Sequence, residues 1–165
     1  SIPQVTDPNE WANLTTGAWC WYNNDSALYG VTYGKLYNWY AVSDPRGLCP
    51  SGYHVPSGYE IAVSLNTQEP LSLVSSSGWP SYPSGPGVIN SSGFSAFPSG
   101  NRYVSQIGIP NLFTSIFDEA GYGSTYFWST YDIGGQAGVF QLNSSEKDNH
   151  GKDKRDGCSV RCIKD

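Results

Sequence analysis

Four cysteines are the residues of this sequence with the widest chemical range, from metal binding to nucleophilic catalysis. Cys20, Cys49, Cys158 and Cys162 lack the paired Cys and His spacing of a zinc site. A strand over residues 158–163 would place its two cysteines on one face about 13 Å apart, too far for a disulfide. Any bridge must therefore reach back to Cys20 or Cys49, where it would contribute about 4 kcal/mol to stability. Two free thiols are the alternative.

The histidines and carboxylates do not form the pattern of a catalytic centre. His54 lies just before a capped helix, where we expect a structural role, and His150 lies in a charged loop, where we expect exposure. Asp118 and Glu119 are neighbours in sequence and fit an acidic loop better than an acid–base pair. The chain has no Gly-x-Ser-x-Gly nucleophile motif. We therefore expect no enzymatic activity, no cofactor and no metal.

Polar and aromatic residues are concentrated near the end of the chain. Tyrosine combined with small polar residues is typical of binding loops, because Tyr offers a large contact area at low entropic cost. This composition favours a ligand-binding surface, and an ordinary hydrophilic surface is the alternative. The residues concerned are Tyr126, Tyr131, Asp132, Gln136, Phe140, Asp148, Asn149, His150, Asp153, Arg155 and Asp156.

Length and composition set the broad class of the protein. A chain of 165 residues predicts one domain with a sizeable core, and an aromatic share of 15% argues against disorder. The net charge of -5 argues against a nucleic-acid partner, which would require a basic stripe. No apolar run approaches the roughly 18 residues of a membrane span. The sequence has no Met, so we expect an initiator or leader to have been removed or replaced.

The first half of the chain contains the signals of two short helices and one strand. Residues 18–22 are aromatic and end in an Asn-Asn-Asp turn, which predicts a strand. Apolar residues at helical spacing predict a helix over residues 35–42. Ser57 and Glu60 form a capping box, which predicts a helix over residues 58–65.

The second half of the sequence predicts a long loop followed by short strands. Residues 66–108 are rich in Ser, Gly and Pro but carry several aromatic rings, which favours a loop laid on the body of the domain. A linker between two domains is the alternative. Short segments separated by Gly-rich and polar turns predict antiparallel strands over residues 126–130, 137–142 and 158–163.

Six motifs, taken in order, resemble the Fibrobacter succinogenes major paralogous domain family. They are WCWYNND, YGKLYNWYAV, GLCPSGYHVPSGYE, SSGFSAFPSGNR, FWST and SVRCIKD. The resemblance implies a C-type-lectin-like fold of the formylglycine-generating-enzyme branch, with all 165 residues in one domain. This fold class is α+β, with two short helices, a small twisted antiparallel sheet and long irregular loops.

The resemblance also implies a display function for the final segment. Members of the family look like bacterial surface or lipoprotein modules, and similar domains serve as variable proteins of diversity-generating retroelements. Gly138 stands where the family usually has an aromatic residue, and Cys158 stands where it usually has Phe. The resemblance implies that both positions are diversified and that Cys158 is an exposed thiol, which conflicts with a two-bridge chain.

These arguments together predict a non-catalytic binding module that presents its final segment to a protein or glycan. The expected contacts are the polar and aromatic residues named above except Asn149, with Gly138 and Cys158 added. We expect a location outside the cell or on its surface, lipoprotein-anchored or virion-associated, and leave the oligomeric state open. Two alternatives are a cysteine-dependent enzyme of the formylglycine-generating type and a structural module of a surface filament or phage tail.

Overall fold

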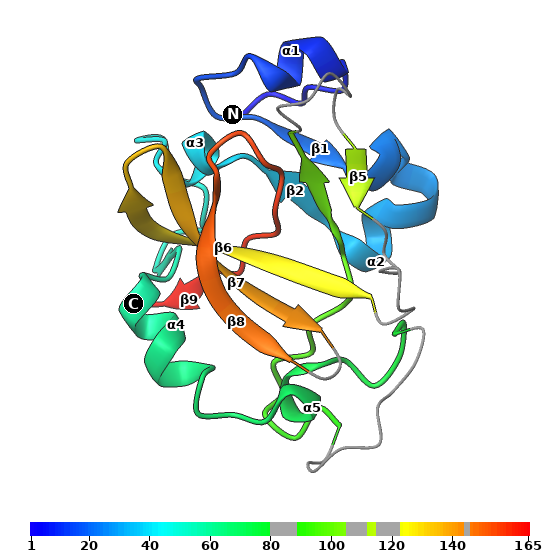
Figure 1. The fold of residues 1–165 in the computed structure, drawn as a ribbon, viewed down its shortest axis with the longest axis vertical. Helices are drawn as coiled ribbons and strands as arrows, with labels where there is room; N and C mark the ends of the chain where they lie inside the picture. Colours follow the sequence, from blue (N-terminus) through cyan, green and yellow to red (C-terminus); the bar gives the residue numbers. More distant parts are fainter. Residues whose placement is uncertain (80–88, 105–111, 115–122, 144–145) are drawn as a thin grey trace.

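The computed structural model describes residues 1–79, 89–104, 112–114, 123–143 and 146–165 (Figure 1). The described part consists of several short helices and four small antiparallel sheets, which confirms the predicted α+β class. It contains more helices than the two expected from sequence. Within these residues, no helix combines the length and apolarity needed to cross a bilayer.

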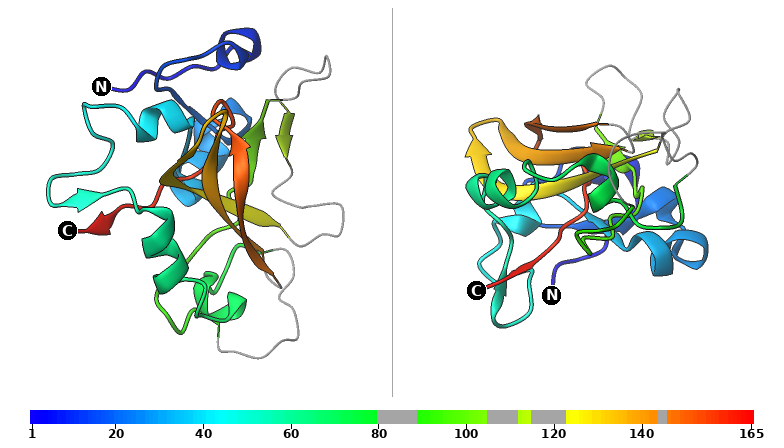
Figure 2. Two further views of the ribbon diagram at one scale, coloured as in Figure 1. Left: turned by 60° about the vertical axis from the view of Figure 1, so that its left-hand side comes forward. Right: turned by 90° about the horizontal axis from the view of Figure 1, so that it is seen from below.

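The largest sheet is a three-stranded antiparallel meander in the order β6-β7-β8. Its strands are β6 (Ser124–Ile133), β7 (Gln136–Asn143) and β8 (Lys147–Asp153). The predicted strands over residues 126–130 and 137–142 are thus confirmed and extended. Seen from below, the sheet forms an upper layer over the first and last segments of the chain (Figure 2). β8 was expected to be a charged loop, and this expectation was wrong.

Both faces of the sheet are covered, which explains the composition of its central strand. One face packs on α4 (Gly58–Ser64) and α5 (Pro70–Leu73) through a cluster that includes Phe127, Phe140 and Leu142. The other face packs on α3 (Trp39–Val42) and on residues 158–160. Residues 137–140 of β7 are consequently buried at every position, as expected of a strand enclosed on both sides.

The helix predicted over residues 58–65 is confirmed as α4. Its capping box is formed as predicted, since Ser57 Oγ accepts from the Glu60 amide and the Glu60 carboxylate accepts from the Ser57 amide. The helix predicted over residues 35–42 is correct only in its second half. Lys35–Tyr37 forms β2, which pairs with β1 (Trp19–Trp21), and the helix α3 begins only after Asn38. The Asn38 side chain caps α3 by accepting from the amide of Ala41, and so fixes where the helix starts.

The strand predicted over residues 158–163 was largely wrong. Residues 158 and 159 make only isolated bridges, and the ladder at this end is β9 (Ile163–Lys164) paired with β3 (Tyr53–His54). Cys162 is bonded to Cys49, with 5.8 Å between the Cα atoms, so the bridge does reach back to the first half of the chain. Cys20 and Cys158 are buried free thiols.

The region predicted as a long loop contains α5 and β4 (Asn101–Tyr103), which pairs with β5 (Leu112–Thr114). Its described aromatic residues lie on the body of the protein: Trp79 is buried and its indole donates to the carbonyl of Ala96. Residues 80–88 and 105–108 of that prediction lie outside the described residues. The remaining elements are α1 (Pro8–Ala12), η1 (Tyr22–Asn24), η2 (Ser26–Gly30) and α2 (Val31–Tyr33).

Candidate functional site

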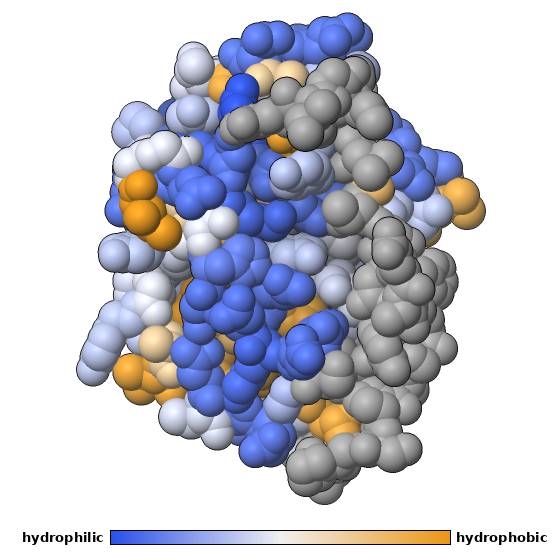
Figure 3. Space-filling model, in the orientation of Figure 1, coloured by the Kyte–Doolittle hydropathy of each residue, from blue (hydrophilic) through white to orange (hydrophobic). Residues whose placement is uncertain are grey.

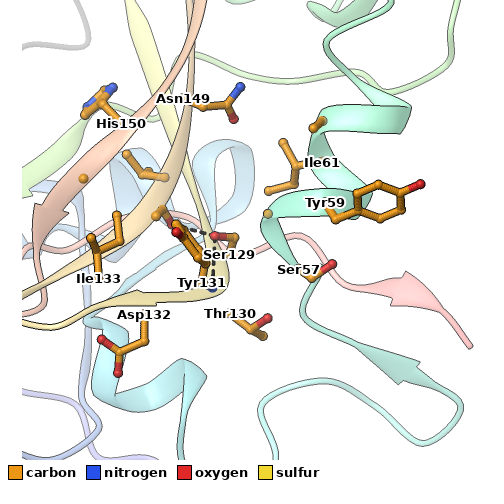
Figure 4. A pocket seen from close by; sticks show the side chains of 15 residues that line it. Ser57, Tyr59, Ile61, Ser129, Thr130, Tyr131, Asp132, Ile133, Asn149 and His150 are labelled. Atoms are coloured by element: carbon orange, nitrogen blue, oxygen red, sulfur yellow. Dashed lines mark hydrogen bonds between the residues drawn. The ribbon is translucent and has the colours of Figure 1, made fainter.

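A pocket of about 620 Å³ lies between the start of α4 and the turn end of the β6–β7 hairpin (Figure 4). Its volume is within the usual range of small-ligand pockets. Four elements line it, contributing residues 57–59, 61 and 62 from α4 and its cap, 129–133 from β6, 138 and 139 from β7, and 149–151 from β8.

A bulge in β6 shapes the wall of this pocket. Between Trp128 and Asp132, three residues of β6 lie opposite a single residue of β7, Gly138. The Ser129 hydroxyl closes the bulge, since it donates to the carbonyl of Gly138 (2.9 Å) and accepts from the amide of Tyr131 (3.3 Å). Bulges of this kind bend a strand and redirect its side chains. Here the bulge turns the last residues of β6 toward α4.

Hydrogen bonds hold the bulge in place from two sides. The amide of Thr130 donates to the carbonyl of Pro56 (2.9 Å), directly before the α4 cap residue Ser57. From the opposite side, the buried indole of Trp39 donates to the carbonyl of Ser129 (2.9 Å). The hairpin and the helix that form the two walls of the pocket are therefore joined through the backbone.

Two glycines, Gly58 at the start of α4 and Gly138 on β7, leave room for the Tyr131 side chain between them. A Cβ at Gly58 would stand 3.4 Å from the Tyr131 Cβ, and a Cβ at Gly138 would stand 2.8 Å from Ser129 Oγ and 3.1 Å from the Tyr131 Cβ. Gly138 lines the pocket as a predicted contact, but it is buried and not displayed as a diversified surface position. The close approach of Ser129 and Tyr131 gives a packing reason for glycine there.

The lining combines an apolar interior with exposed rings. Ile61 points from α4 toward the strands, whereas the Tyr59 ring points away from them (Figure 4). Tyr131 is 59% exposed, Ile133 46% and Tyr59 79%. Apolar surface is visible at the tip of the hairpin and over α4, beside the hydrophilic band formed by β8 (Figure 3). Exposed apolar side chains gathered around a pocket are typical of interaction sites.

Charged groups lie at the rim. Asp132 Oδ1 is 2.7 Å from Lys154 Nζ and also accepts from the amide of Gly134. The hydrogen bond from Lys154 is the main cause that lowers the pKa of Asp132, so this carboxylate is ionised at neutral pH. On β8, His150 Nδ1 lies 3.3 Å from a carboxylate oxygen of Asp148. In the described residues, no three His, Cys, Asp or Glu side chains converge as a metal site would require.

A carboxylate–histidine–carboxylate network lies beneath the start of α4. His54 Nδ1 is 2.6 Å from Asp165 Oδ1, and His54 Nε2 is 3.1 Å from Glu60 Oε1. The bond to Asp165, followed by the bond to Glu60, raises the pKa of His54. The hydrogen bonds from Ser57 are the main reason that the pKa of Glu60 is lowered to about 2. This network links β3, α4 and the segment after β9.

The structure brings only part of the predicted contact set to the pocket. Tyr131, Asp132, Gly138 and His150 line it. Asp153 and Arg155 form an ion pair with each other at 2.7 Å, away from the pocket lining. Also outside the lining are Tyr126, Gln136 and Asp148.

Three further predicted contacts are buried, and their assignment to a displayed surface was wrong. Phe140 belongs to the core beneath α4. Asp156 is enclosed, accepts from the amide of Val104 (2.9 Å) and lies 3.4 Å from Lys152 Nζ. Cys158 has no exposed surface, and burial raises the pKa of its thiol, so it is not the exposed thiol implied by the resemblance. All three lie in segments that other parts of the chain cover.

Sequence reasoning missed the helical half of the pocket. Tyr59, Ile61 and Ala62 were assigned only to a helix, and Ser129 and Ile133 were not assigned to the surface. No sequence signal separates these residues from the rest of the helix, because Ile61 belongs to the apolar stripe that an amphipathic helix buries.

Comparison with known proteins identifies the family of the chain. The family model of the Fibrobacter succinogenes major domain matches residues 1–164. Neither a curated protein nor a solved structure matches the chain. The matched range covers all six motifs and every element that lines the pocket. The chain belongs to the Fibrobacter succinogenes major domain family.

Proposed function

We propose that this chain is a non-catalytic ligand-binding module whose pocket between α4 and the bulged hairpin accepts an apolar or aromatic side chain of a protein ligand. The observation that carries the proposal is the combination of an apolar pocket with exposed Tyr131 and Ile133 at its edge. Such pockets hold the anchor residues that dominate binding energy at protein interfaces. Asp132 and His150 at the rim supply polar contacts that orient the partner.

The composition of the lining favours a protein over a glycan as the ligand. The side chains of Ile61, Ala62, Ile133 and Val139 leave few polar groups inside the pocket. A sugar would bring more hydroxyl groups into this largely apolar space than the few polar groups at its rim can bond, which is costly. A Phe, Tyr, Trp or Leu side chain would instead release water from apolar surface on both partners.

A C-type-lectin-like architecture of the formylglycine-generating-enzyme branch is part of the same proposal. The short helices, the small antiparallel sheets and the family match support it. We also place the module outside the cell or on its surface, as a variable, adhesin-type protein. The Cys49–Cys162 disulfide supports this location, since structural disulfides persist in oxidising compartments.

The two competing functions make different demands on the molecule. A cysteine-dependent enzyme would need an accessible, low-pKa thiol, but Cys158 is buried with a raised pKa and Cys162 is in a disulfide. A structural module of a filament or phage tail would form a broad contact between copies. Sedimentation over a range of protein concentrations would detect that contact.

Selection from a displayed peptide library tests the proposed function. Ala62 lines the pocket and is exposed, so Ala62→Trp should fill it, whereas Val63→Trp places the same ring on the neighbouring exposed residue outside the lining. We expect selected peptides to share an aromatic or aliphatic anchor, to lose binding to the Ala62→Trp variant and to keep binding to the Val63→Trp variant.

Two results would count against the proposal. Selected peptides that bind both variants equally would place the binding surface elsewhere. Failure to select any peptide, together with glycan-array binding that Ala62→Trp abolishes, would assign the pocket to sugars instead of proteins. Thermal unfolding of both variants controls for loss of fold.

A further inference from the structure

A second pocket, of about 560 Å³, lies between β2, α2 and the segment that follows the buried Cys158. It shares no lining residue with the pocket beside α4. Several of its lining residues are aromatic, and two are cationic, Lys35 and Arg161. The inference drawn from it is therefore independent of the proposed function.

The two cations have no acidic partner in the described part of the chain. Neither Lys35 nor Arg161 lies within 4.0 Å of a carboxylate oxygen there. Other cationic side chains of the protein do form such ion pairs, as Arg46 does with Asp44 at 2.6 Å. Within the described segments, therefore, no carboxylate neutralises the charges of Lys35 and Arg161.

Among the described residues, these two cations contact aromatic rings and a backbone carbonyl group instead of carboxylates. Lys35 Nζ lies 3.7 Å from the centroid of the Trp19 ring, and Arg161 Cζ lies 4.7 Å from that of Phe94. The Arg161 guanidinium also donates to the carbonyl of Phe94 (3.0 Å). The Arg161 side chain is exposed, so a ligand can reach its guanidinium from solvent. An anion in the pocket would form charge-assisted hydrogen bonds with these two cations, which are part of a protein of net charge -5.

The remaining lining offers ring faces and hydroxyl groups. Tyr33 and Phe97 pack edge to face, with ring centroids 6.4 Å apart, and form one wall. The hydroxyls of Ser99 and Ser159 lie 2.8 Å apart at the buried end, and Thr32 is exposed at the opening. A ligand that matches these features carries an anionic group, an apolar ring face and several hydroxyls.

We infer that this second pocket binds a sugar acid, a pyranose ring that carries a carboxylate. The carboxylate pairs with Lys35 and Arg161, and the apolar face of the ring packs on the aromatic wall. The sugar hydroxyls exchange hydrogen bonds with Thr32 and with the serines at the buried end. Both a free sugar acid and the end of an acidic polysaccharide present this chemistry.

Titration of the full chain with D-galacturonate, followed by amide NMR shifts, tests the inference, with D-galactose as the neutral match. Trigalacturonate represents the polysaccharide source, and benzoate represents a carboxylate without hydroxyls. We expect saturable binding of galacturonate or trigalacturonate, with shifts around residues 32–35 and 159–161, and much weaker binding of galactose and benzoate.

Charge-neutralising variants locate the site. Lys35→Gln and Arg161→Gln should each weaken binding by about tenfold, the loss expected for one charge-assisted hydrogen bond. Lys164→Gln removes an exposed cation outside the pocket and should leave binding unchanged. If Arg161→Gln fails to fold, Lys35→Gln alone decides the outcome.

Three results would overturn the inference: no saturable binding of either uronate, equal binding of galactose or benzoate, or uronate binding that both folded charge variants retain. The pocket-filling variant Ala62→Trp should leave uronate binding intact. Its effect on peptide binding therefore reports separately on the proposed function.

Discussion

Removing the Cys49–Cys162 disulfide should cost a large part of the stability of this protein. The two cysteines are 113 residues apart in sequence. The chain-entropy relation for a loop of that length gives about 5 kcal/mol at 25 °C. The bond joins the segments that precede β3 and β9, which pair with each other, and β3 is followed directly by α4. We therefore expect the pocket beside α4 to become less ordered when the bond is lost.

Urea unfolding followed by tryptophan fluorescence measures the effect. The double variant Cys49→Ser, Cys162→Ser should show a free energy of unfolding about 5 kcal/mol below that of the oxidised protein. A reducing agent should bring the wild-type protein to the level of the variant and should leave the variant unchanged. The buried thiols of Cys20 and Cys158 are present in both proteins and so cancel in the comparison.

The reasoning fails on either of two results. A loss below about 1 kcal/mol would show that the unfolded chain gains little freedom when the bond is absent. A further loss when the variant is reduced would show that a second disulfide exists, which contradicts the two free thiols.

Two other predictions concern the pocket and its support. Gly138→Val should destabilise the protein by about 1–3 kcal/mol in urea unfolding, because its Cβ would crowd Ser129, whereas Gly135→Ala, which meets no neighbour, should change little. The pKa of His54, followed by NMR, should lie above its ordinary value of 6.5, chiefly through the bond to Asp165. The stabilisation from protonated His54 is full below pH 6.5 and is lost as the pH rises through the raised value, so His54→Gln should flatten this dependence. A His54 pKa at or below 6.5 would contradict the network.

Elements with local determinants could be predicted from the sequence. α4 was found because its capping box needs only Ser57 and Glu60, which are three residues apart. β6 was found because aromatic and β-branched residues dominate it, and β7 because Gly-rich and polar turns bound it. β8 was missed because its residues are polar, and only pairing with β7 makes it a strand. Charged residues are common on such edge strands.

The candidate site was predicted only in part, because local composition indicates some of its residues but not the contacts between distant segments. Tyr131, Asp132 and His150 follow from the polar-aromatic composition of the final segment, but the pocket itself depends on the bulge opposite Gly138. No local signal indicates how far the bulge turns β6 toward α4. The burial of Cys158 likewise depends on α3 and the central sheet covering its segment, which the residues around it do not indicate.

The most direct test of the pocket as a binding site is an amide NMR titration with indole, the ring system of a tryptophan side chain. We predict saturable shifts at about millimolar concentrations, confined to residues 57–62, 129–133, 138–139 and 149–151, and abolished by Ala62→Trp but not by Val63→Trp. Shifts outside these segments, or the same shifts in the Ala62→Trp variant, would contradict the account.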